Sequence, residues 1–304
     1  MLSILIPTYN FDCLNLISTL VKQCEKLLEE EKGFAYEVVV LDDGSSDTDL
    51  AEHVAKGCCK LRGVRWISGG ENCGRAVVRN RLLTEARGEW VVMIDDDAQV
   101  VSDEYVSNYW KHRFTADVLC GDLVNYDECP PGCELRFYYE KAAEPMRSVV
   151  VRNQTPYDRF STFNFMARRD VMLSIGFRNS LKEYGYEDVL LGFELEARGH
   201  SVLHIDNPLL HTGIDSNASF LSKTRAAMRS LSALPLSVRR RIGASRLSLE
   251  LQRCRLRSVV ALILKPLLPL LERQLLSHHP NLQLLKLYKL GYYLNIPTAD
   301  SAEA

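Results

Sequence analysis

The segment Glu37-Val-Val-Val-Leu-Asp-Asp-Gly-Ser45 decides the fold, because it joins a continuous apolar run to a tight polar turn. Strands of a parallel sheet are buried on both faces and therefore read as unbroken Val/Ile/Leu runs. Similar runs occur at Ser3-Ile-Leu-Ile6, Val64-Arg-Trp-Ile67 and Trp90-Val-Val-Met-Ile94. The segments between them that have helical character are residues 14–28, 48–56 and 74–86. We therefore predict an α/β protein with a Rossmann-type open sheet and helices on both faces.

Polar residues follow three of these runs at their carboxyl ends. They are Pro7-Thr-Tyr-Asn10, Asp42-Asp-Gly-Ser-Ser-Asp47 and Asp95-Asp-Asp97. Open α/β sheets bind ligands in the crevice outside the carboxyl ends of their strands. We therefore expect these three loops to converge on one crevice.

Composition separates the chain into two parts. The 304 residues include 37 Lys/Arg, 39 Asp/Glu and 46% hydrophobic residues, which excludes a disordered chain, a collagen-like repeat and a bulk nucleic-acid binder. From Phe220 onward there are 14 Lys/Arg against 4 Asp/Glu, whereas residues 1–219 hold 23 against 35. The acidic part and the basic part therefore need separate explanations.

Cysteines and apolar segments bear on the compartment. Nine cysteines without zinc-site spacing indicate a reduced, cytoplasmic chain. The start, Met1 to Pro7, has no basic region and reads as a strand rather than a signal peptide. The longest apolar stretch, Val259 to Leu271, is broken by Lys265 and two prolines, so no transmembrane helix is expected.

Three carboxylates share one turn at Asp95, Asp96 and Asp97, which is unfavourable unless a cation or a paired base offsets their repulsion. A hard divalent cation such as Mg²⁺ or Mn²⁺ fits, because it takes oxygen ligands and bridges them to substrate phosphates. The alternative is a solvated acidic turn in which Asp97 caps the next helix. The triplet alone leaves both open.

Two further loops carry polar groups suited to a nucleotide. Asp43 lies in a tight turn, and Gly74 stands at a helix entrance with Arg79 one turn inside, an arrangement that suits a diphosphate on a helix N-terminus. An ordinary turn, a helix cap and a surface arginine explain the same residues.

Glu187 and Asp188 begin a helix, where carboxylates interact favourably with the positive helix end, so capping is one explanation. Apolar residues follow directly, and a desolvated Asp188 at the rim of a crevice is a candidate general base. His211 is a candidate metal ligand, with a satisfied loop histidine as the alternative.

Taken in order, the motifs of the chain resemble those of the family 2 nucleotide-sugar glycosyltransferases. They are Ile4-Leu-Ile-Pro-Thr-Tyr-Asn10, Leu41-Asp-Asp-Gly-Ser45, Asn72-x-Gly74 with Arg79-Asn80, Ile94-Asp-x-Asp97, Tyr186-Glu-Asp188 and His211. The resemblance covers residues 1 to 215 and implies a GT-A fold and inverting transfer. A Gln-x-x-Arg-Trp motif, which marks processive members, is absent, so the resemblance implies a non-processive enzyme.

The resemblance also implies a set of nucleotide- and donor-binding residues. They are Pro7, Thr8, Tyr9, Asp43, Asn72, Gly74, Arg79, Asp95, Asp96 and Asn164. Within this set the loop Pro7 to Tyr9 and Asp43 match base and ribose contacts, and Arg79 matches a phosphate contact. Asn164 is a looser match to the donor-sugar pocket.

The catalytic and metal-binding residues follow from the same resemblance. Asp97 matches the direct ligand of a divalent cation, Mn²⁺ or Mg²⁺, and Asp95 and His211 match the rest of the metal site. Asp188 matches the catalytic base, and Glu187 is expected to contact the acceptor.

We therefore expect a metal-dependent, inverting glycosyltransferase of the hexosyltransferase type. It would move a sugar from a nucleotide diphosphate donor, with UDP expected first, to a glycan or lipid-linked acceptor in bacterial cell-surface polysaccharide or lipopolysaccharide synthesis. A catalytically silent nucleotide-sugar-binding or scaffold protein of a glycan assembly complex is the alternative. Nucleic acid is not an expected partner, because the acidic crevice would repel its phosphates.

The predicted domains are a catalytic domain at residues 1–218 and a basic, Leu/Arg-rich helical region at residues 219–304. Two explanations fit the amphipathic helices of this region. They lie in a membrane interface, which would place the protein peripherally on the inner face of the cytoplasmic membrane, or they pack their leucines on the catalytic core.

Overall fold

The computed structural model describes residues 1–178 and 184–297 of the chain, which fold into two compact units. The first unit comprises residues 1–126, 145–180 and 187–213, and the second comprises residues 127–144, 181–186 and 214–304. The predicted catalytic domain extended to residue 218 without interruption. In the structure residues 127–144, which lie inside that predicted domain, belong to the second unit.

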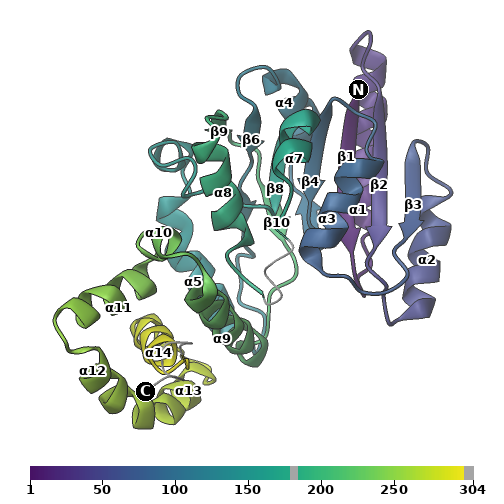
Figure 1. Ribbon diagram of the computed structural model, residues 1–304. Coiled ribbons are helices and arrows are strands. Elements are labelled where there is room, and N and C mark those ends of the chain that lie inside the picture. The colour runs from purple at the N-terminus through teal and green to yellow at the C-terminus, as the bar shows by residue number, and fades with distance from the viewer. Residues whose placement is uncertain (179–183, 298–304) are drawn as a thin grey trace. The chain divides into compact units, whose positions relative to one another are not determined.

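A mixed sheet forms the centre of the first unit, with the strand order β3-β2-β1-β4-β8-β6-β9 (Figure 1). Strands β3, β2, β1 and β4 are parallel, β8 is antiparallel to both β4 and β6, and β9 is parallel to β6. The strands are β1 (Leu2–Thr8), β2 (Tyr36–Asp42), β3 (Val64–Ser68), β4 (Trp90–Ile94), β6 (Val118–Cys120), β8 (Asn164–Arg168) and β9 (Val202–His204).

Helices cover both faces of this sheet, which confirms the predicted architecture. Alternate residues of β1 serve the two faces: Ile4 and Ile6 join one hydrophobic cluster, and Leu5 joins the other. The first cluster includes α1 (Leu14–Glu30), α2 (Thr48–Cys58) and α4 (Tyr105–His112). The second includes α3 (Arg75–Glu85), α7 (Arg169–Ile175) and α8 (Glu187–Ala197). Because both faces are buried, the strands need the unbroken apolar runs seen in the sequence.

A second, three-stranded sheet of the first unit has the order β5-β10-β7. Its strands are β5 (Ala98–Val100), β10 (Leu209–His211) and β7 (Leu123–Val124). Strand β10 is antiparallel to β5, with His211 opposite Ala98. This pairing brings a histidine from the end of the first unit beside the acidic turn that follows β4.

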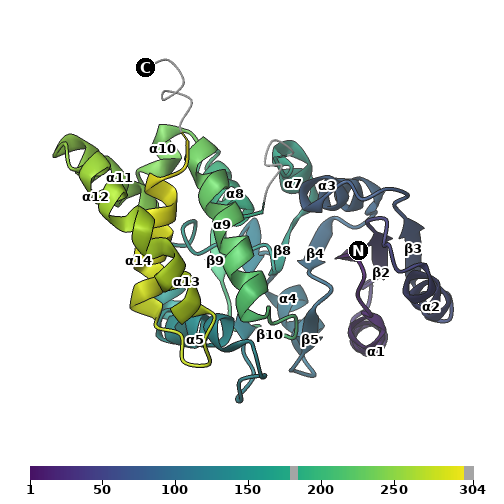
Figure 2. The ribbon, with the colours of Figure 1, turned by 90° about the horizontal axis from the view of Figure 1, so that it is seen from below.

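The second unit is helical (Figure 2). Its helices are α5 (Glu134–Ala143), α9 (Asn217–Ala233), α10 (Leu236–Arg239), α11 (Gly243–Arg253), α12 (Arg257–Leu264), α13 (Leu268–Leu275) and α14 (Leu282–Leu294), with the short helix η2 (Lys265–Leu267) between α12 and α13. Its core joins Leu135, Phe220, Leu271, Leu285 and Tyr288. The predicted C-terminal helices are therefore present. Within residues 1–178 and 184–297, no helix is both long enough and apolar enough to cross a membrane.

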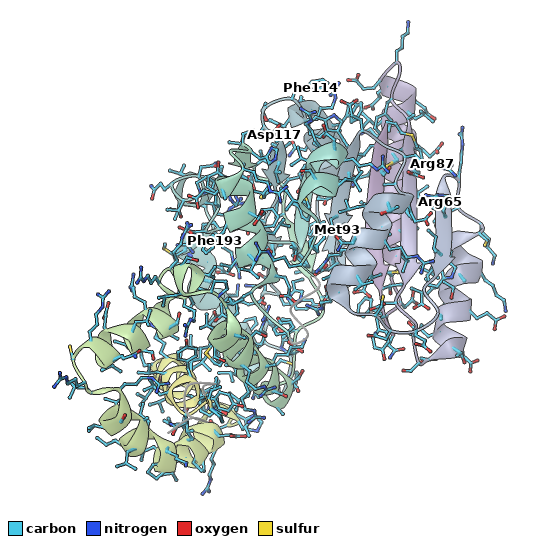
Figure 3. The ribbon with its side chains drawn as sticks, viewed as in Figure 1. Arg65, Arg87, Met93, Phe114, Asp117 and Phe193 are labelled. Carbon is cyan, nitrogen blue, oxygen red and sulfur yellow. The ribbon has the colours of Figure 1, made fainter. Side chains whose placement is uncertain are left out.

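A buried carboxylate connects the starts of several strands in the first unit. It lies at the edge of the sheet opposite the polar loops that follow β1, β2 and β4. Glu37 is 4% exposed and accepts hydrogen bonds from Ser3 Oγ (2.7 Å), Arg65 Nε (3.1 Å) and the backbone N–H of Arg87 (2.6 Å). Figure 3 shows Arg65 and Arg87 in the same part of this unit. One side chain thus links β1, β2, β3 and the chain entering β4.

We predict that Glu37→Ala lowers the free energy of unfolding by about 3 kcal/mol, because it leaves Arg65 Nε and the backbone N–H of Arg87 without their acceptor. Glu85→Ala is the matched control. Glu85 also pairs with Arg65, at 3.6 Å, but its side chain is 39% exposed, and its loss should cost under about 1 kcal/mol. Urea denaturation of both variants measures the difference, and equal losses would contradict this role of Glu37.

Candidate active site

A pocket of about 250 Å³ opens at the carboxyl edge of the parallel strands in the first unit. Its lining residues come from the loops after β1, β2 and β4 and from the start of α3. They are Pro7, Thr8, Tyr9, Asp43, Asn72, Gly74, Arg75, Val78, Arg79, Asp95, Asp96 and Asp97. The structure therefore brings together every predicted nucleotide- or donor-binding residue except Asn164.

Asp43 ties two of these loops together. Its carboxylate accepts hydrogen bonds from the backbone N–H groups of Cys73 and Gly74, each at 3.0 Å, and its own N–H donates to Thr8 O at 2.8 Å. Gly44 makes the close approach possible, because a Cβ there would lie 2.6 Å from the backbone of Glu71 and Asn72. Asp43 thus fixes the entrance of α3 in addition to lining the pocket.

Arg79 and Asp95, which both line the pocket, form an ion pair. Arg79 Nη2 lies 2.5 Å from Asp95 Oδ1, and the arginine is only 3% exposed. Arg79 Nε has no hydrogen-bond partner within the described residues. A buried guanidinium N–H without an acceptor costs free energy, so this group would gain from an anionic ligand.

Asp96 is held between the loop after β1 and its neighbouring carboxylates. Its Oδ2 accepts a hydrogen bond from the backbone N–H of Tyr9 at 3.2 Å. Burial, reinforced by the negative charges of Asp97 and Asp95, raises the pKa of Asp96 to about 7. The crowding predicted for the acidic turn is therefore present.

Asp97 faces His211. His211 Nε2 lies 3.3 Å from Asp97 Oδ2, and Asp97 O accepts a hydrogen bond from the Thr212 N–H at 2.8 Å. Burial raises the pKa of Asp97, but the hydrogen bond and charge of His211 and the charge of Arg75 outweigh it, so the pKa lies below its ordinary value. Gly213 leaves room for this carboxylate, because a Cβ there would lie 2.2 Å from Asp97 Oδ2.

The metal-donor set is small. Asp97 supplies a carboxylate oxygen, the donor type that suits Mn²⁺ and Mg²⁺, and His211 supplies an imidazole nitrogen. Among residues 1–178 and 184–297, no group of three or more His, Cys, Asp or Glu side chains is arranged to hold a metal ion.

Glu187 and Asp188 form the first turn of α8 and lie outside the lining of the pocket. Thr162 Oγ1 donates a hydrogen bond to Asp188 Oδ1 at 3.0 Å. Burial raises the pKa of Asp188, and the nearby charge of Arg79 offsets part of this rise. Burial also raises the pKa of Glu187. The site therefore contains a desolvated carboxylate held by a hydroxyl group.

Asn164 has a different environment from the one expected. It is 2% exposed, and its Oδ1 accepts hydrogen bonds from the Tyr105 and Tyr109 hydroxyls at 2.7 and 2.8 Å. Its Nδ2 donates to Asp122 O and Asn207 O at 3.0 and 2.8 Å. The amide thereby uses its four hydrogen-bonding positions within the protein. A donor-sugar contact at Asn164 has no support in this geometry.

Arg75 lines the pocket but was not among the predicted site residues. Its charge lowers the pKa of both Asp97 and Glu187. Its position in the sequence could have indicated a role in the site. Arg75 is the first helical residue after Gly74, and a cation is unfavourable at a helix N-terminus unless an anion offsets it.

The order of these groups along the chain can be compared with known proteins. A family model described as Glycosyl transferase family 2 matches residues 3–176. The chain belongs to glycosyl transferase family 2. The resemblance seen in the sequence motifs is therefore confirmed.

Relatives of this family 2 glycosyltransferase cover different shares of the chain. EpsH of Bacillus subtilis (strain 168), which carries a glycosyltransferase name, is 24% identical over 216 residues, or 69% of this chain and 59% of EpsH. The glycosyltransferase GlyA of Streptococcus pneumoniae serotype 4 is 23% identical over 175 residues, or 57% of this chain and 22% of GlyA. The matched part of the chain thus spans less than two thirds of either relative.

Solved structures share the fold. The mannosyltransferase PcManGT from Pyrobaculum calidifontis, 16% identical, aligns with a TM-score of 0.53 over 96% of this chain and 84% of its own. TarS 1-349 of S. aureus, 18% identical, aligns with a TM-score of 0.50 over 97% of this chain and 88% of its own. The predicted GT-A-like fold of this family 2 glycosyltransferase is confirmed.

We predict that Gly44→Ala destabilises this family 2 glycosyltransferase more than Gly33→Ala. Both glycines have a positive φ, +71° and +86°, and share the strain of about 1–2 kcal/mol that a side chain meets there. Only at Gly44 would the added Cβ collide with backbone, whereas at Gly33 nothing lies within 4 Å. Urea denaturation should show an additional loss for Gly44→Ala, and equal losses would mean that the two loops separate without cost.

Proposed function

We propose that the protein is a metal-dependent, inverting transferase that moves a sugar from a nucleotide diphosphate donor to an acceptor hydroxyl. The observation that carries this proposal is the pocket at the carboxyl edge of the sheet, where the predicted nucleotide-binding residues and the acidic turn line one cavity. The fold neighbour PcManGT was solved in complex with GDP-Man and Mn²⁺, which supports this class of donor and cation.

The donor is proposed to bind along the loops of this pocket. Pro7, Thr8 and Tyr9 form one wall, with Asp43 and Asn72 beside them, in positions suited to the base and ribose. The diphosphate would lie at the start of α3, where the backbone N–H groups and the positive helix end favour an anion. Arg75 and Arg79 would add positive charge there.

A divalent cation, Mn²⁺ or Mg²⁺, is proposed to bind at Asp97 and His211, which face each other, with the carboxylate oxygen of Asp97 as the donor type that suits these ions. Asp95, already paired with Arg79, lies next to it in the acidic turn. Oxygens of the diphosphate would complete the coordination shell, in agreement with the small number of protein donors. When bound, the cation neutralises the charge of the departing diphosphate.

Asp188 is proposed to act as the general base. Its carboxylate would accept the proton of the acceptor hydroxyl while the acceptor oxygen attacks the anomeric carbon and the nucleoside diphosphate leaves from the opposite side. Burial supports this role, because a raised pKa makes the carboxylate a stronger base. Thr162 orients Asp188 through their hydrogen bond, and Glu187 is proposed to contact the acceptor.

The acceptor is proposed to be a glycan or a lipid-linked saccharide of a bacterial cell surface. A protein that binds the nucleotide sugar without turnover is the competing function, and the two are separated by the experiments below.

The first experiment is a thermal-shift panel of UDP, GDP and dTDP, each with and without Mn²⁺. At a ligand concentration of about 100 times Kd, binding to the folded state adds about 2.7 kcal/mol of stability. We expect one nucleotide to stabilise the wild type in a Mn²⁺-dependent manner, and Asp97→Ala to abolish the response to Mn²⁺.

The matched control is Asp103→Ala, which removes an exposed carboxylate six residues further along the chain and should keep the full response. If no nucleotide stabilises any of the proteins with or without Mn²⁺, the nucleotide site is refuted. A UDP response would also support the nucleotide expected from the sequence.

The second experiment tests the general base with Asp188→Asn. Release of nucleoside diphosphate from the stabilising donor should fall by about 10²- to 10⁴-fold, because the amide cannot accept the proton. In the wild type the rate should fall as the pH drops through the raised pKa of Asp188, where the carboxylate becomes protonated. Retention of activity in Asp188→Asn would refute the assignment.

Stability distinguishes a lost base from a damaged fold in the same variant. Because folding raises the pKa of Asp188, its ionised form destabilises the folded state at pH values above that pKa. Asp188→Asn removes this charge and keeps an acceptor for Thr162, so its free energy of unfolding at pH 7 should equal or exceed that of the wild type. A clear loss of stability would show that the carboxylate has a structural role.

A further inference from the structure

Helices α12 and α13, with η2 between them, carry large apolar side chains in solvent. Val259 is 52% exposed, Leu262 74%, Ile263 57% and Leu270 63%. Leu256 and Leu267, at 48% and 37%, extend this surface along the same helices. We call Leu256, Val259, Leu262, Ile263, Leu267 and Leu270 the apolar face. Large apolar side chains that gather in solvent are typical of an interaction site.

The fold does not need the apolar face for its own packing, because the same helices are anchored by other leucines. Leu264, Leu271 and Leu275 are buried, and the last two belong to the core of the helical unit. Gly291 of α14 allows close contact, since a Cβ there would lie 3.1 Å from Leu264 Cβ. Figure 1 shows α14 in the middle of this unit, with α11, α12 and α13 around it.

The charged residues that lie in the sequence between Glu250 and Glu272, the segment that contains the apolar face, are all positive. Between Glu250 and Glu272 the chain contains no acidic residue, and its charged residues are Arg253, Arg255, Arg257 and Lys265. Arg253, Arg255 and Lys265 are exposed, and Arg257 is half-buried. The apolar face is therefore bordered by cations that have no neighbouring acid in the sequence to neutralise them.

We propose that the apolar face and its bordering cations dock the protein on an anionic lipid membrane surface. The apolar side chains would enter the boundary between headgroups and acyl chains, and the arginines would contact lipid phosphates. A second copy of the chain fits less well, because self-association would place these cations against each other. The proposal rests on the proposed function only for its purpose, which is to bring the enzyme to a lipid-linked acceptor.

The test is co-sedimentation of the full chain with vesicles. We expect binding to phosphatidylcholine vesicles that contain about a third phosphatidylserine to be at least tenfold stronger than to phosphatidylcholine alone, because several cations contribute. Leu262→Ser/Ile263→Ser should reduce this binding by about tenfold or more, since two inserted side chains are lost. The matched control is Leu247→Ser on α11, 42% exposed and outside the apolar face, which should keep wild-type binding.

A charge variant tests the second half of the surface. Arg253→Glu/Arg255→Glu should remove the preference for phosphatidylserine, whereas Lys286→Glu, an exposed lysine on α14, should change it much less. Absence of binding to both kinds of vesicle would overturn the proposal. Equal binding by wild type and Leu262→Ser/Ile263→Ser would also overturn it, as would concentration-dependent self-association that disappears in this variant.

The vesicle assay needs neither donor nor metal, so its outcome is independent of the nucleotide experiments. A protein that binds anionic vesicles but responds to no nucleotide would refute the donor site and leave the docking surface standing. A protein that responds to a nucleotide but does not bind vesicles would support the donor site and refute the docking surface.

Discussion

The crowding of three carboxylates after β4 is the constraint on which the site depends. Each carboxylate contacts a positive or hydrogen-bond-donating group from a different part of the first unit: Asp95 contacts Arg79 of α3, Asp96 the backbone N–H of Tyr9, and Asp97 His211 of β10. Neighbouring carboxylates raise one another's pKa unless positively charged or hydrogen-bond-donating groups offset their repulsion. The positions of the loops around the pocket therefore depend on these contacts of the three carboxylates as well as on backbone pairing.

Most of the first unit could be predicted from sequence because its strands are buried on both faces. The unbroken apolar runs located β1, β2 and β4, and the polar residues after them located the pocket. The family could also be predicted, since the order of the motifs limits the choice far more than any single motif does. These features depend on local sequence, which a reader of the chain can see directly.

The remaining features depend on contacts between distant segments. Strand β10 has only three residues, too few for a periodic signal, although its pairing with β5 positions His211. Asn164 matches the donor-sugar pocket of the family only loosely, and its hydrogen bonds to two tyrosines of α4, more than fifty residues away, cannot be inferred from the sequence. The sequence did not separate buried from exposed leucines of the C-terminal helices: Leu271 and Leu275 lie in the core of the helical unit, and Leu262 and Leu270 are exposed.

The antiparallel strand β8, between β4 and β6, has a consequence for the order in which the site forms during synthesis. Strands β1 to β4 and the loops that line the pocket lie within the first 97 residues, and their parallel pairing requires nothing downstream. Strands β6 and β9 join them only through β8, which begins at Asn164. Because chains emerge from the ribosome N-terminus first, the strands and loops that line the pocket can pair before Asp188 has been translated.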